Sequence, residues 1–374
     1  EEPEDPRDER GKKYPLMDVM IPALYGALIG YEDFTNMSYY LKKREAELTE
    51  RFGLSNGIPS HDTFSAVFRI IDVKQFMRLF VEWTRMIVKE KSGKQIAIDG
   101  KAVRAARKKA EEGNIPYVIS AFLCETGITI GQKEVGEKTN EITEIPKLPD
   151  MIDITGCVVT IDAIGTQKEI MDKIIDKGGH FCLQVKMNRR AAFEAMELYF
   201  TDLNEEESKA FGEPDRYEMA EADHGRIEKR VYCTETDPEK IHGILPDEKW
   251  KHVQSIGMAR LTRETAGHRS TEMHFHVMDQ KLTAKQYGKY ARGHRGIENS
   301  LHWVLDIHFN EDKATARSEN SISNLTLLRK MALNLTKPDP KMAKKTTKKK
   351  MIDFMTEPEL FSKFVFEVLP DADA

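Results

Sequence analysis

Two short apolar runs that each end in an aspartate constrain the fold of this chain most. Ile96 to Ile98 leads into Asp99, and Val158 to Ile161 leads into Asp162. Short runs rich in β-branched residues are typical of buried strands. We therefore expect a sheet in which two neighbouring strands deliver Asp99 and Asp162 to the same edge.

A third acid, Glu298, lies in a segment with a helical pattern. At about 100° per residue, the buried stripe of this helix contains Ile297, Leu301, Val304 and Leu305, and Glu298 lies at its edge. The three acids together predict one metal site, with Asp306 and Asp312 as nearby alternatives to Glu298. His302, one turn after Glu298, either orients a water or a ligand or packs beside Trp303.

The chain has 374 residues, more than a single core usually holds, so we expect two or three domains. We predict a disordered N-terminus over 1–13, a helical domain over 14–93, a catalytic α/β domain over 94–336 and a basic C-terminal tail over 337–374. The tail contains six lysines between Lys341 and Lys350 and is expected to be flexible.

Apolar residues recur at helical spacing through the region from 14 to 93. Ser60 is the expected N-cap of a helix that carries Phe64, Val67 and Phe68 inward. The region is either a helical DNA-binding module or a packing domain that supports the catalytic core. The sequence leaves both alternatives open.

The pattern from residue 95 onward predicts a mixed α/β fold. Three strands, at 95–99, 117–124 and 128–133, form a meander. They are followed by a helix at 145–152, a strand at 158–162, a helix at 167–177 and a strand at 180–186. An insertion at about 190–280 is too long for one crossover, and we expect it to be mostly β. It contains a helical stretch at 191–210 and strand-like segments at 226–234 and 273–278. A last helix is expected at 321–336.

Composition excludes several classes of protein. The sequence has no run of about 18 uncharged apolar residues and no signal-peptide pattern at its N-terminus, so we expect no membrane partner and no export. The four cysteines have no CxxC spacing, which favours reduced core thiols in a cytosol and argues against a zinc site.

Positive charge is clustered, although the net charge is −5. One group follows Asp99 and includes Lys101 and Arg104, and a second follows a later strand. In a third group, spacings of four, four and three place four side chains on one helical face, those of Lys281, Lys285, Lys289 and Arg292. Each group by itself is typical of a solvated surface, but three groups near three candidate metal ligands favour binding to DNA.

These acids and their neighbours resemble the DDE transposases of bacterial insertion sequences, in particular the family that includes the H-repeat-associated proteins. The resemblance extends from about Tyr14 to Thr336. It is carried by residues 56–64, 97–101, 140–142, 167–170, 224–228 and 296–306.

The resemblance implies a ribonuclease H-like fold with its insertion before the helix that bears Glu298. It also implies that Asp99, Asp162 and Glu298 are catalytic and hold two Mg²⁺ ions, for which Mn²⁺ can substitute. The partners it implies are double-stranded DNA, as terminal repeats and as target, and a second copy of the chain in the DNA complex. The expected location is the bacterial cytoplasm, at the nucleoid. The residues expected to bind DNA are Lys101, Arg104, Lys186, Asn188, His224, Arg226, Lys285, Lys289 and Arg292.

Two hard cations suit this chemistry. Mg²⁺ prefers oxygen ligands and keeps waters, so a few carboxylates and a substrate phosphate complete its shell. Paired ions can activate the attacking oxygen and stabilise the leaving 3′ oxygen in line. Carboxylates crowded together without metal would raise one another's pKa, and the cations reverse that tendency.

The sequence departs from the family pattern at Arg295, Met187 and Arg189, where family members often have Trp, Gly and Gln. The acids themselves are intact. Three functions are therefore open: a transposase that cleaves and joins DNA, a metal-dependent nuclease that cuts without joining, and a domesticated, catalytically inactive DNA-binding protein.

Overall fold

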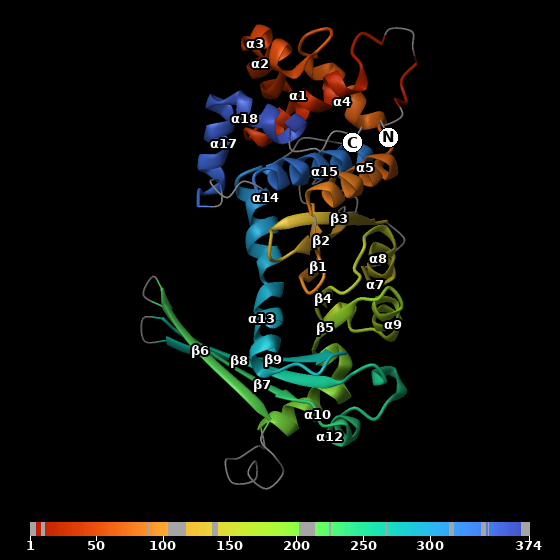
Figure 1. The fold of residues 1–374 in the computed structure, drawn as a ribbon, viewed down its shortest axis with the longest axis vertical. Helices are drawn as coiled ribbons and strands as arrows, with labels where there is room; N and C mark the ends of the chain where they lie inside the picture. Colours follow the sequence, from red (N-terminus) through yellow and green to blue (C-terminus); the bar gives the residue numbers. More distant parts are fainter. Residues whose placement is uncertain are drawn as a thin grey trace. The chain divides into compact units, whose positions relative to one another are not determined.

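The computed structural model describes residues 5–8, 12–88, 90–103, 117–136, 141–201, 214–223, 226–265, 268–313, 318–337, 342 and 344–367. The chain forms two compact units. Unit 1 comprises residues 1–90, 100–140 and 298–374, and unit 2 comprises 91–99 and 141–297. Both α-helices and β-strands are present, as the sequence predicted (Figure 1). The predicted domain boundaries stay predictions.

Unit 1 begins with five helices, α1 (Leu16–Leu28), α2 (Phe34–Lys43), α3 (Glu45–Phe52), α4 (His61–Ile70) and α5 (Val73–Ile87). The predicted start of α4 is confirmed, because the Ser60 side chain accepts a hydrogen bond from the Thr63 N–H. Phe64, Val67 and Phe68 are buried, as their spacing predicted.

A central helix, α15 (Glu319–Leu335), organises the core of unit 1. It contacts α1, α4, α5 and the antiparallel hairpin of β2 (Tyr117–Leu123) and β3 (Ile128–Val135). Asn324 Nδ2 donates to the carbonyls of Phe68 and Ile71, and the Asn334 side chain pairs with both backbone groups of Thr129. Buried amides therefore fix α15 in register with the elements around it.

The C-terminal segment of unit 1 is helical, which corrects the prediction of a flexible tail. The helices α17 (Thr347–Thr356) and α18 (Pro358–Ser362) precede a π-helical turn, Lys363–Glu367. Phe354 is fully buried, and Phe361 packs on the rings of Tyr25 and Phe52. The lysine-rich stretch therefore leads into an amphipathic helix, whose apolar face stabilises unit 1.

The sheet of unit 2 starts from three parallel strands, β1 (Gln95–Ala102), β4 (Val158–Ile161) and β5 (His180–Val185). Between them the chain forms α7 (Glu141–Glu144), α8 (Leu148–Met151) and α9 (Lys168–Asp176). Helix α9 contacts β5 from one side, and α13 (Ala284–His294) contacts β4 and β5 from the other (Figure 1). Strand β4 is buried throughout, and packing on both faces explains why it is apolar except for Thr160.

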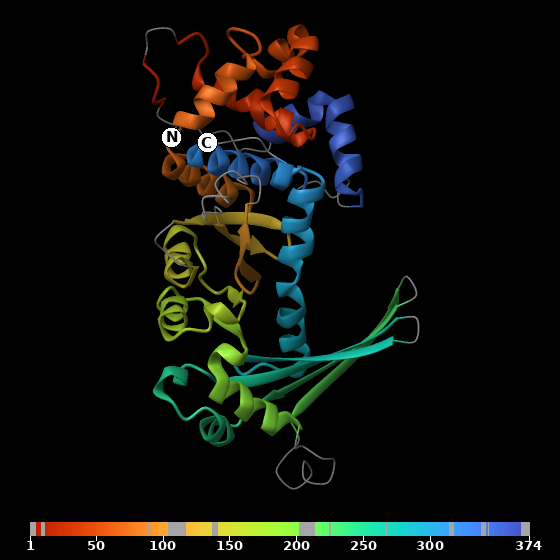
Figure 2. The same ribbon diagram turned by 180° about the vertical axis from the view of Figure 1, so that it is seen from behind.

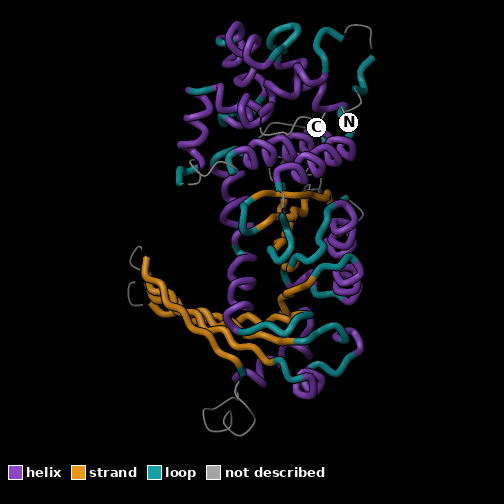
Figure 3. Tube along the Cα trace, in the orientation of Figure 1, coloured by secondary structure: helices purple, strands orange, loops and turns teal. Residues whose placement is uncertain are grey.

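The predicted insertion is mostly β, as expected, and it extends the same sheet. Strand β9 (His268–Met278) pairs antiparallel with β5, and β8 (Ser255–Thr265), β7 (Arg226–Glu235) and β6 (Asp215–Asp223) follow in that order. Two of its strands, β6 and β8, were not predicted. The four strands form a long curved ribbon that reaches beyond α10 (Arg190–Thr201) and α12 (Pro238–Ile244) (Figures 2 and 3).

The four cysteines form no disulfide, and three of them are buried. Across the residues described, we find no helix with the length and apolar character that spanning a membrane requires. In the described part of the N-terminus, Arg7 forms an ion pair with Asp5 at 2.7 Å.

Candidate active site

Two of the three candidate acids leave the sheet of unit 2 at the same edge. Strands β1 and β4 are parallel, and their pairing ends at Ile98 and Ile161, so the next residues both lie just past the paired stretch: Asp99 within β1 and Asp162 directly after β4. Asp99 is half-buried, and the Asp162 side chain is 45% exposed. The predicted arrangement of these strands is therefore present.

Asp162 is held in its ionised form by neighbours from the next strand. Lys186, directly after β5, places its Nζ 2.7 Å from Asp162 Oδ1, and the Ala163 N–H donates to the same oxygen. Burial would raise the pKa of Asp162, but the Lys186 ammonium and this N–H outweigh burial and lower it. Asn188 Nδ2 donates to the Ala163 carbonyl at 2.8 Å and fixes the loop after Asp162.

A polar network that the sequence did not reveal lies beside these aspartates. His294, at the end of α13, contacts Thr160 Oγ1 through Nδ1 at 3.1 Å. Gln95 Nε2 donates to the same hydroxyl at 3.0 Å and to the Tyr290 carbonyl at 2.8 Å. Burial lowers the pKa of His294, although Asp99 and Asp162 oppose this effect, so the imidazole is neutral at pH 7. The one sequence signal for His294 is its position, one helical turn before Glu298.

Glu298 belongs to unit 1, where it is exposed and begins a π-helical turn, Glu298–His302, that continues into α14 (Trp303–Ile307). The predicted stripe is confirmed, because Ile297, Leu301, Val304 and Leu305 are all buried. His302 is also buried, as the packing alternative requires, whereas Trp303 is 53% exposed. Single π-helical turns are frequent at functional sites.

Lys101 and Asp306, two other candidates, contact each other within unit 1. The Lys101 ammonium pairs with Asp306 and lies 2.8 Å from Glu311 Oε2. Burial would lower the pKa of Lys101, but these two carboxylates outweigh burial and raise it. Asp312, the other nearby acid, has one buried carboxylate oxygen, Oδ1, without a hydrogen-bond partner among the residues described. The structure thus gives Lys101 protein partners, where the sequence suggested a phosphate contact.

The basic face predicted before Glu298 is partly present. Lys285 and Lys289 are exposed on α13, four residues apart. Arg292, on the same helix, pairs with Glu221 of β6 at 2.7 Å. The prediction that Lys281 shares this helical face is wrong, because Thr283 caps α13 and Lys281 lies before the helix begins.

One further DNA-binding candidate, Arg226, lies on the ribbon. Arg226 is exposed on β7 and pairs with Glu228 at 2.8 Å. Arg104 and His224 lie outside the described residues. Of the departures from the family pattern, Met187 is 56% exposed, and Arg295 donates to His274 Nε2 at 3.1 Å. Arg189 donates through Nε to the Thr166 carbonyl at 3.0 Å.

The donor chemistry at Asp99 and Asp162 fits a hard divalent cation. Both are carboxylates at one sheet edge, and Asp162 is ionised and partly accessible. Within the described ranges, however, no group of three or more His, Cys, Asp or Glu side chains is arranged to hold a metal ion. Asp162 instead uses its oxygen Oδ1 to pair with Lys186.

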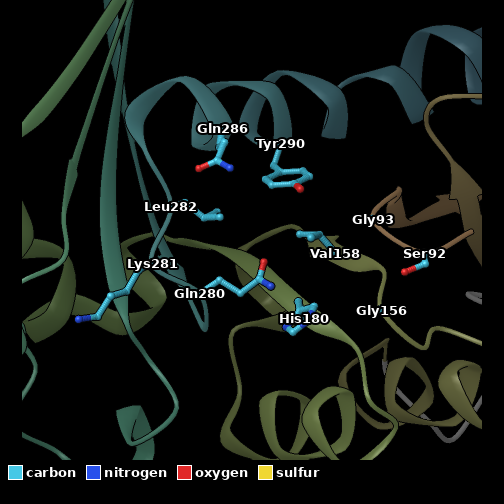
Figure 4. Close-up of a pocket in the computed structure, with 10 residues that line it drawn as sticks. All are labelled: Ser92, Gly93, Gly156, Val158, His180, Gln280, Lys281, Leu282, Gln286 and Tyr290. Atoms are coloured by element: carbon cyan, nitrogen blue, oxygen red, sulfur yellow. The ribbon is translucent and has the colours of Figure 1, made fainter.

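Unit 2 also contains a cavity of about 430 Å³ at the opposite ends of the same strands (Figure 4). Gly93 and Gly156 precede β1 and β4, and His180 begins β5. Gln286 and Tyr290 of α13 line the other side. Since Asp99 and Asp162 follow the carboxyl end of the paired stretch of β1 and β4, this cavity is separate from the candidate acids.

Comparisons with known proteins identify the family of this chain. Residues 90–335 match the family described as "Transposase DDE domain", and residues 1–84 match the family described as "DDE_Tnp_1-associated". The chain is 31% identical over 339 residues to "Putative transposase YncI" of Escherichia coli O157:H7, covering 88% of this chain and 84% of that protein. It is 30% identical over 345 residues to "H repeat-associated putative transposase YhhI" of Escherichia coli K12, covering 91% and 89%.

Proposed function

Because this chain belongs to the transposase DDE domain family, we propose that it cleaves DNA at the ends of an insertion sequence and joins the freed 3′ hydroxyl to target DNA. The observation that carries the proposal is the placement of Asp99 and Asp162 directly after the paired stretch of two parallel strands. Two carboxylates so placed, one of them ionised by Lys186, suit a phosphoryl-transfer site that works with metal ions.

The proposed fold of the catalytic domain is ribonuclease H-like. Three features of the two units support it: the antiparallel hairpin of β2 and β3, the parallel order of β1, β4 and β5, and the helices between those strands. The insertion precedes the segment that begins at Glu298, which is the layout that the sequence predicted.

Asp99, Asp162 and Glu298 would hold two Mg²⁺ ions, with Mn²⁺ as a substitute. Bound there, the ions would lower the pKa of the attacking water and neutralise charge on the phosphoryl oxygens. The protein holds Asp162 ready as a carboxylate, because Lys186 and the Ala163 N–H keep its pKa low. The neutral His294 imidazole and the Thr160 hydroxyl fix the end of α13 against β4.

Binding to DNA is proposed to rely on exposed cations. Lys285 and Lys289 share one face of α13 and would contact phosphates, which adds affinity without sequence readout. The expected partners are double-stranded terminal repeats, target DNA and a second copy of this chain. Such activity would take place at the nucleoid in the cytoplasm of a bacterium.

The proposal is tested by incubating the whole protein with DNA that carries the sequences flanking its own gene and a separate target duplex. Wild-type protein with Mg²⁺ should nick the ends and yield joined products, and EDTA should abolish both. Cleavage without joined products would favour the nuclease alternative. Binding without cleavage in Mg²⁺ or Mn²⁺ would favour a catalytically inactive DNA-binding protein.

A further inference from the structure

Three charged side chains in unit 1 form a partly buried cluster, which we call the Lys101 cluster: Lys101, Asp306 and Glu311. Lys101 lies on β1, two residues after Asp99, and its side chain is 15% exposed. Asp306 is on α14, eight residues after Glu298, and Glu311 is 1% exposed in the turn that follows. Within unit 1, the cluster thus joins the end of β1 to the segment that begins with Glu298.

The Lys101 ammonium has carboxylate partners on both sides. It pairs with Asp306, and its distance to Glu311 Oε2 is 2.8 Å. A lysine stem has four rotatable carbons, so an amine fixed by two partners no longer has the freedom that a phosphate-seeking surface lysine keeps. An ammonium shared in this way is a poor candidate for contacting DNA.

Two further basic residues, both on α15, also act on Glu311. Arg329 and Lys330 on α15 are buried, and both act electrostatically on Glu311. Lys330 donates to Ser120 Oγ and Gln132 Oε1, each at 2.7 Å, and so ties α15 to the β2–β3 hairpin. The Lys101 cluster is therefore supported by the core of unit 1, and Lys101 cannot move without leaving a buried carboxylate unpaired.

We propose that Lys101 is a positioning residue, which fixes the segment that begins with Glu298 against the end of β1 within unit 1, rather than a phosphate ligand. This inference rests on the proposed function. A residue of this kind acts on the reaction through geometry, and a displacement of about 1 Å can cost on the order of 10²-fold in rate. A phosphate ligand would act through affinity for DNA.

The test compares Lys101→Met, Asp306→Asn and the double variant in the whole protein, at a temperature where all three remain folded. The single-turnover cleavage rate at saturating DNA should fall by about 10²-fold in each. The double variant should be no slower than the slower single variant, because both changes break the same link. The dissociation constant for DNA and its salt dependence should stay within about twofold of wild type.

A matched control is Lys147→Met. Lys147 pairs with the buried Glu144 at 2.7 Å, but it lies in unit 2 on the turn before α8. This variant should cleave at the wild-type rate. Should Lys101→Met not fold, Lys101→Met combined with Glu311→Gln removes the unpaired buried carboxylate and still breaks the link. The same fall in rate is expected from it.

A second measurement does not depend on catalysis. Hydrogen exchange without metal or DNA should show amides of residues 298–307 exchanging at least about tenfold faster in Lys101→Met, with α9 unchanged. If wild-type protein cleaves nothing, the proposed function fails while this measurement still tests the link. The inference is overturned if exchange at 298–307 is unchanged, or if the variant cleaves at the wild-type rate once DNA is saturating. It is equally overturned by weaker DNA binding with a salt slope lower by about one unit, which would identify Lys101 as a phosphate ligand.

Discussion

The buried Lys330 should make the stability of unit 1 depend on pH in a way that one substitution removes. Burial lowers the pKa of Lys330 from 10.5 to about 7, despite the opposing charge of Glu311. Between these two values the unfolded chain binds a proton that the folded protein does not, so the free energy of unfolding rises with pH. The free-energy cost of Lys330 to folding is therefore fully present below pH 7, where the amine is charged in both states, and absent above pH 10.5, where it is neutral in both.

The magnitude follows from that shift. Between pH 7 and pH 9, this one group should add about 2 kcal/mol to the free energy of unfolding. Lys330→Met lacks the amine, so the difference in stability between wild type and variant should change by about that amount over this interval. The difference at any single pH has no fixed sign, because Met also leaves Ser120 and Gln132 without their donor.

The assay is urea unfolding of both proteins at pH 7, 8 and 9, followed by tryptophan fluorescence. Lys42→Met, at an exposed position on α2, is the matched control and should show no such change. A difference between wild type and Lys330→Met that stays constant to within about 0.5 kcal/mol across this range would refute the reasoning.

Three further predictions concern packing and DNA binding. Gly293→Ala should lower the free energy of unfolding by about 1–3 kcal/mol in thermal or urea denaturation. The reason is that a Cβ at this position would collide with Gln95 Oε1 and disturb the hydrogen bonds of Gln95 to Thr160 and Tyr290. An unchanged free energy of unfolding would contradict this close approach. Phe354→Ala should cost about 3–5 kcal/mol in the same assay, whereas a flexible tail would tolerate it. Lys285→Glu combined with Lys289→Glu should weaken binding to any duplex and lower the log–log salt slope of the binding constant by about one unit for each phosphate that these lysines neutralise. The control Lys168→Glu, on the exposed side of α9, should change neither quantity. If a salt titration gives the same slope as wild type, Lys285 and Lys289 do not contact phosphates.

Features that depend only on a few neighbouring residues could be predicted from the sequence. Ser60 and the apolar residues after it specify the start and the buried face of α4, and the structure confirms both. The apolar runs before Asp99 and Asp162 likewise specify two strands, because period and composition are local signals. The stripe next to Glu298 follows from the same periodicity.

Features that depend on distant partners could not be predicted. Lys101 pairs with Asp306, 205 residues further along, so its position after Asp99 suggested a phosphate ligand instead. His294 joins the candidate site only because α13 packs against β4, where Thr160 lies. The C-terminal lysines concealed an amphipathic helix, since net charge dominates the pattern while Phe354 and Lys350 are buried.

Cleavage of end-bearing DNA by single variants of the three acids tests the central claim most directly. Asp99→Ala, Asp162→Ala and Glu298→Ala should each reduce the Mg²⁺-dependent rate by on the order of 10³-fold or more. Binding to the same DNA should be nearly unchanged, because phosphate contacts come from Lys and Arg. Asp176→Ala, an exposed acid on α9, should cleave normally. If Glu298→Ala cleaves at the wild-type rate while Asp306→Ala or Asp312→Ala does not, the third metal ligand is wrongly assigned; if Asp99→Ala and Asp162→Ala also cleave normally, the account is contradicted.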